Sequence, residues 1–134
     1  MKQFLSMSVF AGVLIGIAGL VYLRVGGLAG AVLFAFGLLC VVMCGAQLYT
    51  GKSGFLPYRQ WPRLLAMLAG NAVGCLLAAV IARYCANEVV INNLQTILSA
   101  RMSASWDALL VTSVGTGMIM TLAVYGARRG HYWP

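Results

Sequence analysis

The side chains that carry most enzyme chemistry are scarce in this chain. Its only acidic residues are Glu88 and Asp107, and its only histidine is His131. A metal site needs several convergent ligands, and a catalytic triad needs a base beside its nucleophile. The composition therefore argues against an enzyme of either kind, and we expect no catalytic residue, no metal site and no cofactor.

The four cysteines, at positions 40, 44, 75 and 85, lack the spacing of a zinc finger. Cys40 and Cys44 stand one helical turn apart, a placement that does not favour a disulfide. The simpler interpretation is that all four are small hydrophobic residues buried in a helical bundle.

The residues best suited to bind a ligand lie in one stretch, GAQLYTGKSG at 45–54. It contains three glycines, and because each weakens a helix by about 1 kcal/mol relative to alanine, we expect a helix broken near 45–52. A break at membrane depth leaves backbone groups unpaired. Such backbone is tolerated only where it is buried in protein or lines a water-filled cavity. The free N–H end of a half-helix favours anions, and transporters bind substrates at such breaks. The stretch predicts a small-anion site, with a plain loop as the alternative.

A second polar group at the predicted membrane depth is Asn71, which lies within the motif Gly70-xxx-Gly74. An amide left unpaired in lipid costs several kcal/mol, so Asn71 should hydrogen-bond to a neighbouring helix or face a cavity. Small residues one turn apart also let helix backbones approach closely. The same spacing recurs in Gly12 and Gly16 and in Ser113 and Gly117. Ordinary bundle packing is the simpler interpretation, and a dimer seam is the alternative.

The elements that position these residues must sit in lipid. Of 134 residues, 62% are hydrophobic and 8% are charged, whereas soluble domains carry roughly 25% charged residues. The net charge of +7 could suggest nucleic acid, but the basic residues are scattered between apolar runs and suit the role of topology determinants. The composition predicts an integral membrane protein that contacts the lipid bilayer and no nucleic acid.

A membrane-spanning helix needs roughly 20 apolar residues. The sequence predicts an all-α, polytopic membrane helical bundle with about four transmembrane helices, the second of them broken, in a single membrane domain over 1–134. We expect the helices at approximately 4–23, 28–56 (broken near 45–52), 62–84 and 106–127. The polar stretch 85–105 is expected to connect the last two helices outside the membrane, with a short helix around 90–98 as an option.

Lysine and arginine accumulate on the cytoplasmic side of membrane proteins. With the N-terminus inside, six basic residues fall on the inner side and three on the outer side. The inner set is Lys2, Lys52, Arg59, Arg63, Arg128 and Arg129, and the outer set is Arg24, Arg83 and Arg101. We therefore expect a protein of the cell inner (plasma) membrane with both termini in the cytoplasm.

Several stretches together resemble the formate/nitrite transporter (FNT) family. The run FAFGLLCVVMCGAQLYTGK at 34–52 is similar to that family's second helix and the loop that breaks it. Further on, LAGNAVGCLLAAVI at 68–81 is similar to the third helix, and TGMIMTLAVYGARRG at 116–130 to the fourth. The resemblance covers nearly the whole chain and implies part of the aquaporin-like FNT fold. It also implies a short form that lacks the last two helices.

The resemblance further implies that a substrate pathway passes these helices. Leu48, Tyr49 and Thr50 match the family's loop residues that gate the pore, and Thr50 would offer its hydroxyl to a passing anion. Phe34 and Leu38 fall at the family's apolar constriction. Without the resemblance, lipid contact or core packing would be the preferred interpretation of these last two residues.

Arg101 and Asn71 complete the predicted pathway. Arg101 stands where the family keeps a lysine before the fourth helix, and a cation there would raise the local anion concentration. An arginine keeps that attraction but does not give up its proton, and a snorkelling interfacial arginine is the alternative. Gln47 replaces the family's loop acid, and Gly117 replaces an asparagine of the fourth helix.

The leading hypothesis is a membrane transport protein or channel for small monovalent anions such as formate or nitrite. By resemblance it would assemble as a homo-oligomer, a pentamer, or together with a second membrane chain. The alternative is a non-conducting accessory or split-transporter membrane subunit that keeps the scaffold for interaction with a partner chain.

Overall fold

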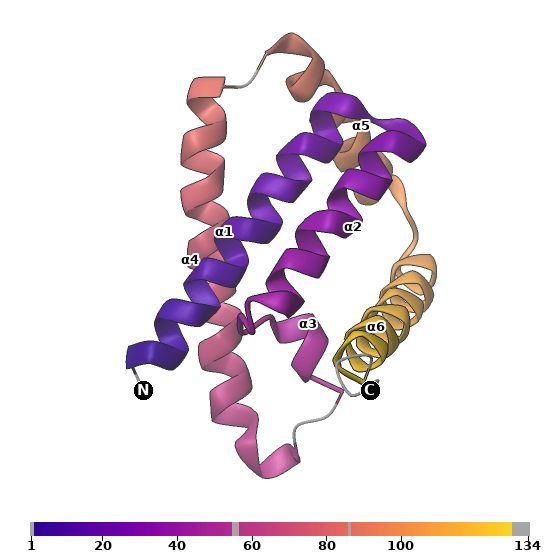
Figure 1. The fold of residues 1–134 in the computed structure, drawn as a ribbon. Helices are drawn as coiled ribbons and strands as arrows, with labels where there is room; N and C mark the ends of the chain where they lie inside the picture. The colour runs from indigo at the N-terminus through magenta and orange to yellow at the C-terminus, as the bar shows by residue number, and fades with distance from the viewer. Residues whose placement is uncertain (1, 55–56, 86, 130–134) are drawn as a thin grey trace.

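The computed structural model describes residues 2–54, 57–85 and 87–129. Within these ranges the chain is helical apart from short connections, and no strand is present (Figure 1). The elements are α1 (Lys2–Val25), α2 (Gly27–Met43), α3 (Tyr49–Lys52), the 3-10 turn η1 (Tyr58–Gln60), α4 (Trp61–Cys85), α5 (Glu88–Ser103) and α6 (Trp106–Arg129). The second predicted helix is thus broken, as the glycines of 45–54 indicated.

A two-glycine turn lays α2 beside α1. Gly26 and Gly27 have φ angles of 66° and 55°, in the left-handed region that glycine enters without a steric penalty. The Gly26 N–H donates to the Tyr22 carbonyl at 2.8 Å, and the Gly30 N–H donates to the Gly26 carbonyl at 2.9 Å. The chain therefore reverses direction over one non-helical residue (Figure 1).

The contact between α1 and α4 depends on glycine. A Cβ added to Gly12 would lie 2.2 Å from the carbonyl oxygen of Asn71, and one added to Gly74 would lie 2.1 Å from that of Val9. No side chain fits at such distances, so the two backbones approach as closely as small residues allow. Ordinary packing within the chain therefore accounts for both glycine pairs, and α4 lies along α1 (Figure 1).

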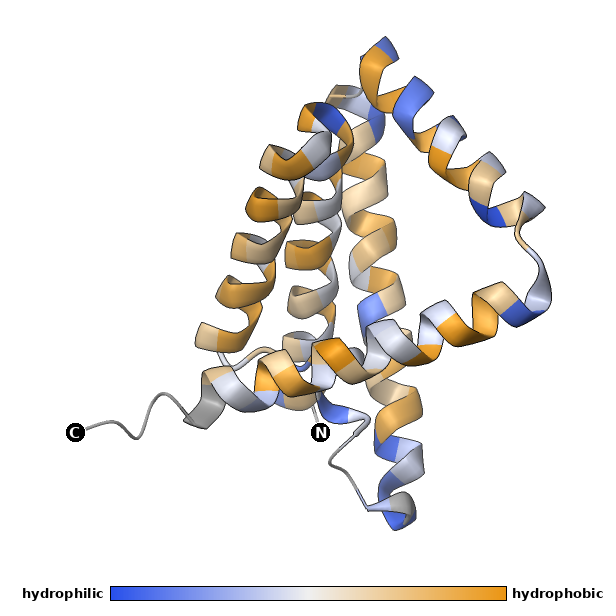
Figure 2. Cartoon of the chain, turned by 90° about the vertical axis from the view of Figure 1, so that its right-hand side faces the viewer, coloured by the Kyte–Doolittle hydropathy of each residue, from blue (hydrophilic) through white to orange (hydrophobic). Residues whose placement is uncertain are grey.

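The last two helices are less embedded. An Asn87 side chain that accepts from the Val90 N–H at 3.3 Å caps α5, and this cap with Glu88 in the first turn explains a helix longer than the expected 90–98. Helix α6 runs across the bundle rather than along it (Figure 2). It contacts α3 and α2, and among its described side chains Val124, 4% exposed, is the one that is buried.

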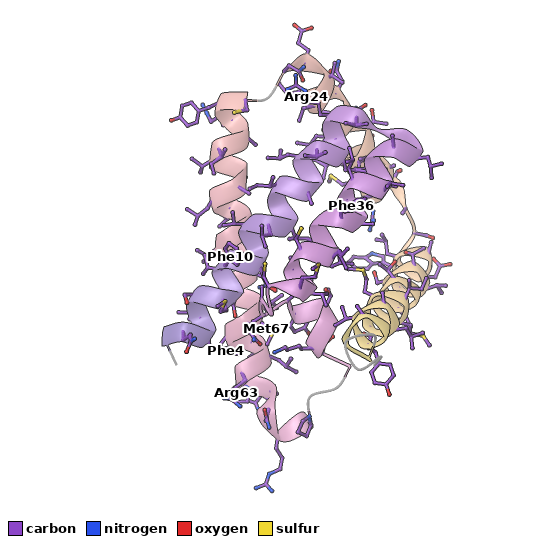
Figure 3. All side chains as sticks on the ribbon, viewed as in Figure 1. Phe4, Phe10, Arg24, Phe36, Arg63 and Met67 are labelled. Atoms are coloured by element: carbon purple, nitrogen blue, oxygen red, sulfur yellow. The ribbon has the colours of Figure 1, made fainter. Side chains whose placement is uncertain are left out.

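The surface of the bundle suits lipid. Three helices, at Gln3–Val25, Trp61–Cys85 and Trp106–Ala127, are long and apolar enough to cross a membrane, and α2 is a shorter apolar helix. Apolar residues run along all sides of these helices (Figure 2). Met67 is 1% exposed, whereas Phe36, on α2, is 60% exposed; both are labelled in Figure 3. Such apolar surface would drive aggregation in water. The predicted membrane helical bundle is confirmed.

Two further features bear on the sequence-based expectations. Arg24 and Arg63 lie at opposite ends of the bundle (Figure 3), the separation that the charge count requires. The Arg63 guanidinium lies 5.8 Å from the centre of the Phe4 ring. The interpretation of the cysteines as buried residues is wrong, because all four are exposed.

Candidate functional site

The end of α2 is closed by its own backbone. Gly45 has a φ of +64°, its N–H donates to the Val42 carbonyl at 3.1 Å, and the Ala46 N–H donates to the Val41 carbonyl at 3.0 Å. This is the Schellman arrangement, in which a left-handed glycine lets the N–H groups that follow the helix donate to its last carbonyls. Ala46 and Val41 are both buried, in one cluster. Gly45 therefore ends α2 and directs the chain inward, toward α1 and α4.

The residues after this turn are held by the side chain of Asn71. Its Nδ2 donates to the carbonyls of Ser8 at 2.7 Å and Gln47 at 2.9 Å, and its Oδ1 accepts from the Tyr49 N–H at 2.8 Å. The Gln47 N–H donates to the Met7 carbonyl at 3.3 Å. Asn71 is 8% exposed, so the prediction that it would hydrogen-bond to a neighbouring helix is confirmed.

The expectation that the break presents bare N–H groups is wrong at its two best-placed amides. The N–H groups of Gln47 and Tyr49 are both paired within the chain. The physical reason is the cost of leaving a buried backbone donor without an acceptor. Moreover, α3 has four residues, too few to build a large dipole. Attraction for an anion must therefore come from side chains.

A lysine closes the break from the other side. The Lys52 Nζ donates to the Gln47 Oε1, while the Gln47 Nε2 donates to the Gly45 carbonyl at 3.3 Å. Lys52 is half-buried. Gln47 thus links the two ends of the irregular segment. Lys52, the last residue of α3, brings a positive charge to it.

One cavity of about 610 Å³ connects α3, α5 and α6. Thr50 contributes from α3 and Arg101 from α5, with Ser113, Thr116 and other residues of α6 forming the remaining wall. We call it the Thr50–Arg101 cavity. Two of the residues that the sequence predicts for a substrate pathway, 51 positions apart, therefore face the same space.

The hydrogen-bond donors of this cavity fall into two groups. The hydroxyls of Thr112 and Thr116 donate to helix carbonyls four residues earlier, each at 2.7 Å. The hydroxyls of Thr50 and Ser113 make no hydrogen bond to any residue that the structure describes, and Arg101 forms no salt bridge within the same ranges. These three side chains are the donors that remain for a ligand.

The other predicted pathway residues lie elsewhere. Leu48 is 8% exposed in the buried cluster around Ala46, and Leu38 packs against that cluster. The Phe34 ring meets the Tyr22 ring edge-to-face, with 6.5 Å between the centroids. These contacts are those of core packing between α1 and α2. Tyr49 is half-buried beside Thr50.

Sequence reasoning missed the wall that α6 supplies. The one-turn spacing of Ser113 and Gly117 predicts packing, although a run of three hydroxyls at 112, 113 and 116 in an apolar helix is a signal for a polar face. Among the described residues, no group of three or more His, Cys, Asp or Glu side chains could hold a metal ion. His131 lies outside the described ranges.

Comparison with known proteins adds to this geometry. The sequence model of the formate/nitrite transporter family matches residues 1–131. A formate-nitrite transporter of Entamoeba histolytica is 25% identical to the chain over an alignment that covers 93% of this chain and 42% of that protein. The chain thus spans less than half the length of this relative. No solved structure matches this chain.

Proposed function

The chain belongs to the formate/nitrite transporter family, and from this premise we propose that it contributes a pathway for small monovalent anions, such as formate or nitrite, across a membrane. The family is one of transporters and not of enzymes. The observation that carries the proposal is the Thr50–Arg101 cavity, where a permanent positive charge and two hydroxyl donors face one space.

Arg101 supplies the attraction. A guanidinium stays charged at every physiological pH, and a positive group above low-dielectric walls concentrates anions in a cleft. Apolar residues such as Ile97, Leu109 and Met120 share the cavity wall, so the charge is less screened than in open water. The anion would enter beside Arg101.

Thr50 and Ser113 take over where the anion loses water. A hydroxyl that has no acceptor within the described chain can donate to a carboxylate or nitrite oxygen without breaking an existing bond. Leu48 and Tyr49 precede Thr50 and would form the narrow, apolar part of the pathway. Phe34 and Leu38 lie on α2 before the break, and their contacts support a packing role.

A second candidate function is a non-conducting accessory or split-transporter subunit. The observation that favours it is α6, whose apolar side chains Leu110, Met118 and Ile119 are 64%, 62% and 69% exposed. A second membrane chain or further copies of this one, up to a pentamer, would cover that surface. We place the protein in the inner (plasma) membrane with cytoplasmic termini, on the strength of the charge count.

Flux into proteoliposomes tests the proposal. The purified chain should pass formate or nitrite faster than empty vesicles do. Because focused charge raises local anion concentration by about 10- to 1,000-fold, Arg101→Ala should lower the flux at least about tenfold. Arg83→Ala is the matched control, since this exposed arginine at the end of α4 does not line the cavity.

One result would remove the channel interpretation, and a second would remove the role of the Thr50–Arg101 cavity. Flux of the unaltered chain equal to that of empty vesicles would leave the accessory role, which then requires co-purification with a second hydrophobic chain. Equal flux losses in Arg101→Ala and Arg83→Ala would mean that Arg101 has no special role in lining the cavity.

A further inference from the structure

Asn71 touches three segments that are distant in sequence. Its amide contacts the carbonyl of Ser8 in α1, the carbonyl of Gln47 in the irregular segment and the N–H of Tyr49 at the start of α3. An asparagine side chain has two N–H donors and one carbonyl acceptor. Both donors are used, and the carbonyl already accepts a short bond. No donor of Asn71 therefore remains for an anion.

We infer that Asn71 is a positioning residue, whose amide holds the break between α2 and α3 and thereby sets where Thr50 faces the cavity, without itself binding the anion. Tyr49 and Thr50 are consecutive, so the bond at the Tyr49 N–H fixes the backbone one residue before the hydroxyl. The inference rests on the proposed function only for the role of Thr50.

The glycines of the α1–α4 contact make this arrangement possible. The backbone carbonyl oxygen of Asn71 lies 2.2 Å from where a Cβ of Gly12 would be, and a Cβ of Gly70 would lie 2.6 Å from the Ser8 Cβ. Only at this backbone separation can the short side chain of Asn71 reach across to α1 and still meet Gln47. The close packing of two helices is thus transmitted to the break by one amide.

Loss of the amide would leave the Gln47 carbonyl and the Tyr49 N–H, both partly buried, without the partner they have now. The Ser8 carbonyl lies within α1, where a helix N–H four residues further on can still donate to it. Unpaired buried polar groups are costly, so the segment 46–49 would move to find water or new acceptors. Thr50 would move with it. Arg101 and Ser113 belong to α5 and α6 and make no hydrogen bond to Asn71, so they should keep their positions.

Cysteine accessibility measures this directly. In a background with Cys40, Cys44, Cys75 and Cys85 replaced by alanine, Thr50→Cys and, separately, Ser113→Cys are reacted with an anionic methanethiosulfonate reagent in proteoliposomes. Adding Asn71→Ala should change the Thr50→Cys rate by about tenfold, the equivalent of one unmade buried hydrogen bond. The Ser113→Cys rate should stay within about twofold.

Two further variants separate positioning from general stability. Asn71→Gln keeps both N–H donors and the acceptor on a side chain that is one methylene longer, so its effect on the Thr50→Cys rate should be smaller than that of Asn71→Ala, and it remains usable if the alanine variant does not fold. Asn93→Ala is the matched control, because Asn93 also donates an amide to a helix carbonyl, that of Leu23 at 2.7 Å, away from the break.

Equal rate changes at both probes, or no change at Thr50→Cys, would overturn the inference. The labelling needs no flux, so its outcome is independent of whether the chain conducts. Formate or nitrite should slow the modification of Thr50→Cys in the asparagine background. Failure of that protection would count against the anion pathway and leave the effect of Asn71→Ala as the test of positioning.

Discussion

In the contact between α1 and α4, a Cβ added to Gly74 would lie 2.1 Å from a backbone oxygen, whereas on α6 a Cβ added to Gly115 would meet no atom within 4 Å. Both glycines sit in long apolar helices, and both belong to stretches rich in small residues. The difference teaches that small residues permit close packing but do not specify it. What decides is whether a matching surface faces them.

The two regions also divide the work of the candidate site. The α1–α4 contact fixes the break through Asn71, while α6 supplies the wall that faces Thr50. One region is held by hydrogen bonds and interlocked backbones. The other is joined to α3 by few contacts, among them the Gly51 approach to Val124 and a hydrogen bond of 3.4 Å from the Thr121 hydroxyl to the Thr50 carbonyl.

The largest effect on stability should come from overfilling the α1–α4 contact, the tight region of the molecule. In Gly74→Val the new side chain would meet the backbone of Val9 and Val13, which cannot move unless α1 moves. Overpacking costs about 1–3 kcal/mol and more where backbone resists. The folded fraction on size exclusion and the Tm in detergent should both fall sharply. Gly115→Val on α6 is the control, and similar losses in the two variants would show that the regions do not differ.

Asn71→Leu should cause the second-largest loss of stability. The substitution is close in volume but leaves the Ser8 and Gln47 carbonyls and the Tyr49 N–H without the side-chain partner they have now. A buried group left unsatisfied costs about 1–3 kcal/mol, so the Tm should drop by several degrees. Asn93→Leu removes a single amide contact from a more exposed site and should cost less. A larger loss in Asn93→Leu would contradict the assignment of the break as the better-held region.

Much of the tight region could be predicted from the sequence. Glycines within 45–54 indicated the break, and Asn71 was expected to hydrogen-bond because an amide at membrane depth must. These signals are local, since each arises from what one residue does to its own backbone or its own solvation. The resemblance to the transporter family then singled out Thr50 and Arg101.

The loose region, which is α6 with the cavity that it shares with α3 and α5, could not be predicted in the same way. That Thr50 and Arg101 share a cavity depends on where α5 ends and how α6 crosses, and neither is encoded within a few residues. The spacing of Ser113 and Gly117 suggested packing, but a Cβ on Gly117 would meet no neighbour within 4 Å. Leu38 and Phe34 show the converse, because their apolar character fits a constriction and a core equally well.

Ser113→Ala should affect transport more than stability. The hydroxyl has no partner within the described chain, so its removal should leave the Tm within about 2 °C, as expected for surface substitutions of about 0.5 kcal/mol or less. Loss of one hydrogen bond to an anion should lower formate flux about tenfold or more, since such bonds to charged groups contribute about 1.5–3 kcal/mol. Thr112→Val is the comparison variant, because the Thr112 hydroxyl already donates to the Ala108 carbonyl. Equal flux losses would show that the donor groups are not distinguished as proposed.

The smallest effect, and the one whose sign matters most, belongs to Gly115→Ala. With no atom within 4 Å of the added Cβ, the isolated chain should gain up to about 1 kcal/mol, because alanine is the better helix former. If a second chain or another copy packs against this face of α6, the same methyl group would press on the partner and weaken the assembly. Measuring the Tm of the purified chain and its oligomeric state by chemical cross-linking separates the cases. A higher Tm with unchanged cross-linking means that lipid covers Gly115, whereas fewer cross-linked oligomers mean that protein does.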